Sequence, residues 1–166
     1  KELLGQNKNA LDVSNSSLKE QEKQTAILGA SSLALEDIAK IYEHTEEFIE
    51  LFEYSIPWIQ ELKEKGYKVY VLSNWSEPAY EANKDTHLRF LREMDGGILS
   101  FREGMIKPDR KIYQLLCDRY HIQPQEAVFL DDNLANIKGA EEFGLHAIHF
   151  RNYEQAKKEL DKLLQR

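Results

Sequence analysis

The sequence predicts an α/β fold, a Rossmann-like parallel sheet with helices on both faces, preceded by a small N-terminal helical cap subdomain. Downstream of residue 55, short apolar segments alternate with amphipathic helical segments, which is the pattern of parallel strands joined by helical crossovers. Upstream of residue 55, helix-like patterns recur without a strong strand signal. We therefore divide the chain into a helical cap subdomain at 1–55 and an α/β core at 56–166.

Each core element has a local signal. The first helix, 56–65, ends at Gly66, a residue favoured just after helices. The predicted strands are short runs rich in β-branched and aromatic residues, and the later helices have apolar residues at helical spacing. These strands cover 67–72, 97–100, 128–130 and 145–150, and the helices cover 78–93, 109–120, 133–143 and 153–164.

Composition narrows the function classes. The 166 residues carry a formal charge of −7, and a pI near 5.3 argues against a nucleic-acid or anionic-membrane partner. No apolar run approaches the roughly 20 residues of a membrane helix, and no secretory signal is visible. Cys117 is the single cysteine, which predicts a buried structural thiol. We expect a cytoplasmic protein.

Two adjacent acids end the most informative segment. The apolar run 127–130 leads into Asp131 and Asp132, and a helical pattern follows. A buried parallel strand would deliver both acids to its carboxyl end, where open α/β sheets bind ligands. The two charges repel each other unless a cation lies between them, and Mg²⁺ suits their oxygen ligands. The alternative is an ordinary N-cap for the next helix.

Two further strand-to-helix loops carry polar residues. Ser73 and Asn74 follow the strand 67–72 and supply donors for a phosphate or carboxylate oxygen, although a simple helix cap is the alternative. Lys107 precedes Pro108, which favours an extended backbone, and Asp109 can cap the next helix. An exposed lysine is the alternative there. Together the loops offer donors, a cation and paired acids, as a phosphoryl group with a bound metal requires.

The order and spacing of these residues resemble the second, third and fourth motifs of the haloacid dehalogenase-like hydrolase superfamily, in particular its cap-bearing phosphatases and dehalogenases. The matching segments are V-Y-V-L-S-N-W-S at 69–76, E-G-x-I-K-P-D-x-x-I-Y at 103–113, and F-L-D-D-N at 129–133 with Asn136, Gly139 and Ala140. The resemblance covers about residues 56–150, and residues before 55 lie where this family often inserts a cap.

The resemblance implies phosphoryl transfer with Mg²⁺ through an aspartyl-phosphate intermediate. Ser73 and Asn74 would bind the phosphoryl group, and Lys107 would neutralise the nucleophilic aspartate and a phosphate oxygen. Asp132 would bind Mg²⁺ directly, and Asp131 would act through a water or support the site as a neighbouring acid. Two further residues have supporting roles: Asn136 would hold the loop by hydrogen bonds, and Trp75 would line the pocket or pack between core and cap.

The family's first motif, an apolar strand that carries the nucleophile and the general acid, has no match in this chain. We expect this strand to precede Lys1 in a longer parent; the alternative is a natural non-catalytic relative. In the family it lies between the strands that end at Ser73 and Asp131. Its absence predicts a gap in the sheet, and a 166-residue polypeptide that is inactive and poorly folded alone.

The leading hypothesis is a Mg²⁺-dependent phosphatase for a small phosphorylated metabolite, because dehalogenases of this family work without a metal and usually lack the double acid. The alternatives are a haloacid-dehalogenase-type hydrolase and a non-catalytic binding or scaffold module. A phosphoacceptor receiver domain fits less well, since it has no place for the residues before 55 or the loop at 107–109. The substrate and the oligomeric state, a homo-oligomer included, stay open.

Overall fold

Between residues 50 and 165, short strands alternate with helices, which confirms the predicted α/β pattern. The computed structural model describes these residues, so the predicted cap at 1–55 lies almost entirely outside the described part. The strands are β1 (Tyr70–Ser73), β2 (Gly96–Leu99), β3 (Val128–Asp131) and β4 (His146–His149). The helices are α4 (Ser55–Glu64), α5 (Glu77–Asn83), η2 (Arg89–Glu93), α6 (Ser100–Glu103), α7 (Arg110–Tyr120), η3 (Pro124–Glu126), α8 (Leu134–Phe143) and α9 (Tyr153–Leu164).

The strands pair as two separate parallel ladders. β1 pairs with β2, with Leu72 opposite Ile98, and β3 pairs with β4, with Asp131 opposite His149. Within residues 50–165 the sheet therefore consists of two two-stranded pieces, and neither β1 nor β3 has a strand on its other edge. This break lies where the sequence predicts a gap, between the strand that ends at Ser73 and the strand that ends at Asp131.

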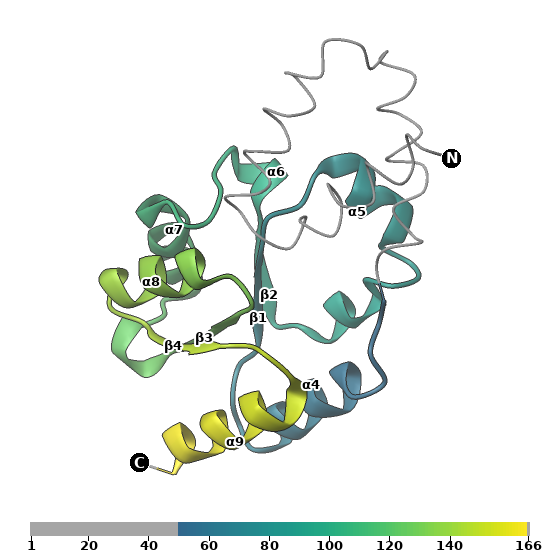
Figure 1. Ribbon diagram of the computed structural model, residues 1–166. Coiled ribbons are helices and arrows are strands. Elements are labelled where there is room, and N and C mark those ends of the chain that lie inside the picture. Colours follow the sequence, from purple (N-terminus) through teal and green to yellow (C-terminus); the bar gives the residue numbers. More distant parts are fainter. Residues whose placement is uncertain (1–49, 166) are drawn as a thin grey trace, which may run out of the picture.

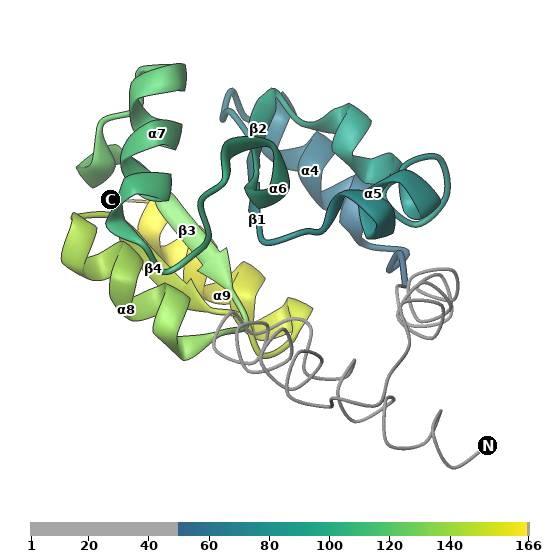
Figure 2. The same ribbon diagram turned by 90° about the horizontal axis from the view of Figure 1, so that it is seen from above.

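Helices cover both faces of the strands. In Figure 1, α8 lies above β3 and β4 and α9 lies below them, so the two helices pack on opposite faces. α4 lies beside α9, and Nζ of Lys157 in α9 donates to both carboxylate oxygens of Glu61 in α4, at 2.7 and 2.6 Å. Seen from above, α7 and α8 lie to the left of β1 and β2, and α4 and α5 lie to the right (Figure 2).

The connection between α4 and β1 explains why the first strand begins later than predicted. Gly66 has a φ of +89°, a value that favours glycine, and it ends the helix as expected. The N–H of Tyr67 donates to a carbonyl in the last turn of α4 at 3.1 Å. The N–H of Val69 donates to the carboxylate of Asp95 at 2.9 Å. The ladder with β2 therefore starts at Tyr70 rather than at Tyr67.

The helical stretches predicted over 78–93 are two elements, α5 and η2. The carbonyl of Asn83 accepts hydrogen bonds from the N–H groups of Thr86 and Leu88, at 3.1 and 3.0 Å. Its side-chain Nδ2 donates to the carbonyl of Ala79 at 2.9 Å. These contacts end α5 and turn the chain toward η2. The spacing of apolar residues does not predict such a break.

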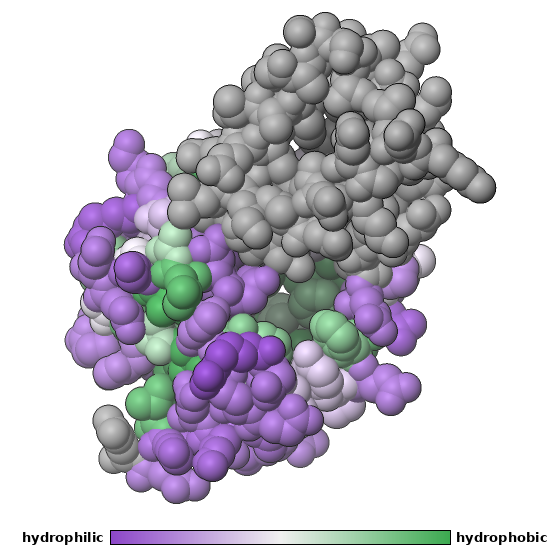
Figure 3. Space-filling view, in the orientation of Figure 1, coloured by the Kyte–Doolittle hydropathy of each residue, from purple (hydrophilic) through white to green (hydrophobic). Residues whose placement is uncertain are grey.

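The hydrophobic core lies where α7 meets the strands and α8. Ile98 in β2, Ile112 and Tyr113 in α7 and Ala140 in α8 are completely buried in one cluster, so α7 packs against elements of both strand pairs. Cys117 is buried in the same cluster, as predicted. Figure 3 shows mostly hydrophilic outer helices and apolar residues in a recess at the centre of the face. No helix in the described part has the length and apolar character to span a bilayer.

Tyr120, the last residue of α7, contacts the backbone of β2. Its hydroxyl accepts a hydrogen bond from the N–H of Gly97 at 2.7 Å and donates to the carbonyl of Gly97 at 3.1 Å. Its ring centre lies 4.6 Å from that of Tyr70 in β1. A Cβ atom at Gly97 would lie 2.3 Å from the carbonyl oxygen of Val71, so this close pairing of β1 and β2 requires glycine.

Candidate active site

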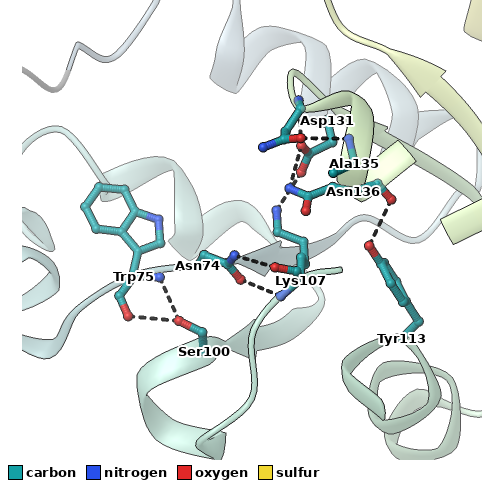
Figure 4. A network of polar contacts seen from close by, with 9 residues as sticks. Asn74, Trp75, Ser100, Lys107, Tyr113, Asp131, Ala135 and Asn136 are labelled. Carbon is teal, nitrogen blue, oxygen red and sulfur yellow. Dashed lines mark hydrogen bonds and ion pairs between the residues drawn. The ribbon is translucent and has the colours of Figure 1, made fainter. Parts of the chain in front are cut away.

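The carboxyl ends of β1 and β3 carry the predicted site residues. Ser73, which is half-buried, and Asp131 are the last residues of these two strands. Lys107 comes from the loop between α6 and α7, and it bonds Asn74, which follows β1, and Asp131 at the end of β3 (Figure 4). The structure thus brings all three predicted loops to one edge of the sheet, as parallel strands require.

Lys107 and Asp131 form a buried ion pair. Nζ of Lys107 lies 2.6 Å from Oδ2 of Asp131, and the two side chains are 8% and 6% exposed. The same Nζ lies 5.4 Å from the centre of the Phe129 ring. The other oxygen of Asp131, Oδ1, accepts from the backbone N–H of Asn133 and from Nδ2 of Asn136, each at 2.9 Å. Every oxygen of this buried carboxylate therefore has a partner, which burial of a charge demands.

The start of α8 is fixed by polar side chains around that pair. Asn133 is the N-cap, and its side chain accepts from the N–H of Ala135 at 2.7 Å. The sequence predicts that Asn136 holds the loop, and besides bonding Asp131 it accepts a hydrogen bond from the hydroxyl of Tyr113 at its carbonyl, at 2.9 Å. Burial, and then the Asp131 charge, raise the pKa of Tyr113 far above its ordinary value. The hydroxyl therefore stays protonated and donates.

Asn74 holds the loop that carries Lys107. Its Oδ1 accepts from the N–H of Lys107 at 2.9 Å, and its Nδ2 donates to the carbonyl of Lys107 at 3.1 Å (Figure 4). The side chain thus pairs with both backbone groups of one residue, much as a neighbouring strand would. A carboxamide carries two N–H donors, and no contact within residues 50–165 uses the second, which can donate to a ligand.

The Lys107 loop is also held from the side of the helices. Asp109 caps α7 as predicted, accepting from the N–H of Lys111 at 2.9 Å. Pro108 packs on α8 at Gly139, where an added Cβ would lie 2.9 Å from Cβ and 3.0 Å from the carbonyl oxygen of the proline. A larger residue at 139 would push this loop, and with it the lysine, away from Asp131.

Trp75 has its backbone fixed by Ser100, the first residue of α6. Oγ of Ser100 accepts from the N–H of Trp75 at 2.9 Å and donates to its carbonyl at 3.0 Å. Ser100 is buried, whereas Trp75 is only partly buried. The tryptophan therefore has a fixed backbone beside the predicted site, as Figure 4 shows. Its part in lining a pocket stays a prediction.

Asp132 contrasts with its neighbour. The residue is exposed, and no side chain among residues 50–165 forms an ion pair with it. Partial desolvation by the surrounding protein, and then repulsion from Asp131, raise the pKa of Asp132 above its ordinary value. Its carbonyl oxygen lies 2.9 Å from Nε2 of His149, at the end of β4. A carboxylate that is held at the sheet edge and forms no ion pair with residues 50–165 fits a hard cation such as Mg²⁺.

The described residues do not complete a metal site. Between residues 50 and 165, no group of three or more His, Cys, Asp or Glu side chains is arranged to hold a metal ion. Asp131 has its oxygens on Lys107 and two amide donors, which leaves Asp132 as the acid available for direct coordination. A bound ion would therefore need further oxygen ligands from substrate, water or other residues of the protein.

Sequence reasoning assigned no role to four residues that support this site, which are Ser100, Tyr113, Asn133 and His149. Tyr113 and Asn133 lie within the matching segments, and a signal was present for Asn133, because an amide directly before a helical pattern is a common N-cap. Ser100, Tyr113 and His149 act through contacts between elements that are distant in sequence.

The parallel strands covered by helices form a Rossmann-like α/β core, and the Lys107–Asp131 pair and Asp132 lie at its carboxyl edge. The chain belongs to the haloacid dehalogenase-like hydrolases, whose family model matches residues 4–144. This bears out the resemblance that the three motifs indicate.

Relatives in this family differ in activity. The chain is 35% identical over 121 residues to acyl-CoA dehydrogenase family member 10 of Mus musculus, covering 72% of this chain and 11% of that protein. It is 31% identical over 91 residues to the sesquiterpene phosphatase astK of Aspergillus oryzae, covering 55% and 46%. It is 31% identical over 90 residues to (S)-2-haloacid dehalogenase 4A of Burkholderia cepacia, covering 54% and 38%. The chain thus spans less than half of the length of each of these relatives.

Solved structures support the fold. A predicted haloacid dehalogenase-like hydrolase from Porphyromonas gingivalis superposes with a TM-score of 0.63 at 20% identity, covering 94% of this chain and 78% of that one. A family enzyme from Bacteroides thetaiotaomicron, in complex with magnesium and inorganic phosphate, superposes with a TM-score of 0.61 at 20% identity, covering 84% and 73%. At this identity the likeness shows the fold alone.

Proposed function

We propose that this protein is a Mg²⁺-dependent phosphatase that acts on a small phosphorylated metabolite through an aspartyl-phosphate intermediate. The observation that carries the proposal is the difference between two adjacent acids. Asp131 is buried and neutralised by Lys107, whereas Asp132 is exposed at the same sheet edge without an ion-pair partner among residues 50–165. Desolvation and repulsion from Asp131 disfavour the ionised form of Asp132, so an acid at this sheet edge favours a bound cation. The similarity to a phosphatase supports the same activity.

The described residues bind and orient the phosphoryl group in this proposal. The hydroxyl of Ser73 donates to one phosphoryl oxygen, and Asn74 donates with the N–H that the Lys107 carbonyl does not use. Lys107 supplies positive charge to the attacking carboxylate and to a phosphoryl oxygen. Asp132 would hold Mg²⁺, with Asp131 linked through a water, and the ion would stabilise the charge that develops on the phosphoryl oxygens.

The nucleophile in this proposal is an aspartate on a strand between β1 and β3. Its carboxylate oxygen forms a bond to phosphorus while the ester P–O bond breaks, and the leaving oxygen takes a proton from an acid on the same strand. Water then attacks the phosphorus of the acyl phosphate and gives its proton to the conjugate base of the same acid. The acyl O–P bond breaks, which releases inorganic phosphate and restores the carboxylate. The free inner edges of β1 and β3 in the described part support this location. We further propose that the cap at 1–55 selects the substrate.

The test is phosphate release by the full-length protein from p-nitrophenyl phosphate and a panel of sugar, nucleoside and terpenoid phosphates, with Mg²⁺ or with EDTA. We expect turnover that EDTA abolishes, and loss of Mg²⁺-dependent turnover in Asp132→Asn. Asp118→Asn removes an exposed acid on α7 and serves as the control with unchanged activity. The 166-residue chain alone is expected to be inactive. Absence of phosphate release from every ester would overturn the proposal.

The similarity to a 2-haloacid dehalogenase favours a second candidate, hydrolysis of a carbon–halogen bond. Halide release from an (S)-2-haloacid, measured on the same protein with EDTA present, separates the two reactions. Activity that persists in EDTA and in Asp132→Asn would establish the dehalogenase. Absence of both reactions, together with ligand binding that survives Asp132→Asn, would instead indicate a non-catalytic binding module.

A further inference from the structure

The loop that carries Asp132 is held from two directions. From the interior, Asp131 accepts the N–H of Asn133 at 2.9 Å. From β4, the N–H of Phe150 donates to the carbonyl of Asp131 at 2.8 Å, and Nε2 of His149 lies 2.9 Å from the carbonyl oxygen of Asp132. A carbonyl only accepts, so the imidazole must carry its proton on Nε2 and donate.

His149 thereby extends the β3–β4 ladder beyond its last backbone pair. The strands end with Asp131 opposite His149, and the next contact is made by the side chain of the histidine rather than by the backbone. The two peptide groups on either side of Asp132 are therefore both fixed. The first is bound at its carbonyl by β4. The second is bound at its carbonyl by His149 and at its N–H by Asp131.

Fixing both peptide planes fixes φ and ψ of the residue between them, and hence the direction of its Cα–Cβ bond. The backbone of Asp132 is thus fixed, while its carboxylate has no ion-pair partner among the described residues. A ligand oriented in advance loses less conformational freedom when a cation binds.

The histidine is itself held in place. Nε2 of Gln155 in α9 donates to the carbonyl of His149 at 3.1 Å, and Oε1 of the same side chain accepts from the N–H of Arg151 at 3.0 Å. The N–H of Gln155 donates to the N-cap residue Asn152 at 2.9 Å. The backbone that presents the imidazole is therefore tied to the first turn of α9.

We propose that His149 is a positioning residue, which fixes the Asp132 peptide and so directs the Asp132 carboxylate toward the cation. The cation belongs to the proposed function, on which this part of the inference rests. The effect of His149 on the loop does not depend on the cation. Partners that orient a metal ligand typically contribute about 10- to 100-fold to metal affinity.

The test compares His149→Phe, which removes the donor, with His149→Gln, whose amide can donate to the same carbonyl. The control is His146→Phe, at the other end of β4 and exposed. Titration of the full-length protein with Mg²⁺ alone, without substrate, should give about 10-fold weaker binding for His149→Phe. His149→Gln should recover most of the affinity, and the control should match the wild type. Wild-type affinity in His149→Phe would overturn the proposal.

A second measurement separates this inference from the proposed function. Hydrogen exchange of the Asn133 amide, followed without metal, should be faster in His149→Phe and near the wild-type rate in His149→Gln. Unchanged exchange in His149→Phe would overturn the positioning role. Mg²⁺ affinity that survives Asp132→Asn would overturn the cation site of the proposed function, and the exchange data would still decide the role of His149.

Discussion

Asp131 and Asp132 are adjacent in the chain, yet they lie in opposite environments. The Asp131 region is buried, and its lysine and two amide donors satisfy both carboxylate oxygens. The Asp132 residue is exposed, and its carboxylate forms no ion pair with residues 50–165. The buried Asp131 charge and its partners maintain the structure of the loop. The Asp132 charge beside it lowers the free energy of unfolding and forms no ion pair that would offset this loss. This contrast between neighbours fits a supporting role for Asp131 and, in the proposed function, a cation-binding role for Asp132.

The largest effect is expected from breaking the buried pair. Lys107→Met leaves the Asp131 carboxylate buried without its cation and should lower the free energy of unfolding by about 3–5 kcal/mol. Urea unfolding of the full-length protein measures the loss. The double variant Lys107→Met/Asp131→Asn should recover part of it, because no uncompensated charge remains. A loss below about 1 kcal/mol in the single variant would mean that water reaches the pair, and the contrast between the two acids would fail.

Asn74→Ala tests the support of the lysine loop. The substitution removes two hydrogen bonds to the Lys107 backbone and should cost about 1–3 kcal/mol in unfolding free energy. In a phosphatase assay it should also lower kcat, because Lys107 loses its fixed position. Ser76→Ala, at a half-buried serine of the loop before α5, is the matched control. Equal stability of Asn74→Ala and the control would show that the loop is held by α8 alone.

Asp132→Asn should leave stability unchanged or slightly higher at pH 7, since it removes an unpaired charge. The pKa of Asp132 is raised in the folded state, so the folded protein binds the proton more tightly than the unfolded chain. The ionised carboxylate therefore destabilises the fold above that pKa, and the cost disappears as pH falls below the ordinary carboxyl range. Tm values of wild type and variant, compared without metal from pH 7 to pH 4, should converge at the acidic end. A gap that widens toward low pH would contradict this assignment.

The smallest effect is expected at the exposed contact between α4 and α9. Hydrogen bonds from Lys157, and then from Lys65, lower the pKa of Glu61 to about 2. A lowered folded pKa stabilises the fold above the ordinary carboxyl pKa, and this contribution is lost as pH falls toward about 2. Glu61→Gln should therefore lower Tm slightly at pH 7, and less at pH 3 or in 1 M salt. A pH-independent difference would point to packing rather than charge.

Much of the fold could be read from the sequence because the signals were local. α9 has the predicted bounds, Tyr153–Leu164, since its apolar repeat is regular and Asn152 caps it. β1 was less predictable, because its start depends on Tyr67 completing α4 and on Asp95 binding Val69 from across the chain. A contact between distant segments leaves no periodic trace in the sequence.

In the site, too, local patterns were predictable from the sequence and contacts between distant segments were not. Parallel strands place their ends on one edge, so the meeting of Ser73, Lys107 and the two acids was predictable from order alone. The partners of these residues were not, because the bond between Asn74 and Lys107 joins loops 33 residues apart.

The hydroxyl of Tyr120 on Gly97 has a consequence for assembly. Free strand edges invite pairing with other chains, and proteins usually block them. The hydroxyl of Tyr120 bonds both the N–H and the carbonyl of Gly97 on the outer edge of β2. A strand of another copy therefore cannot pair with these two groups. In the described part the inner edges of β1 and β3 have no such guard. We therefore expect an additional strand to pair between β1 and β3 rather than outside β2. The centre of the sheet is the position at which a further strand can be added.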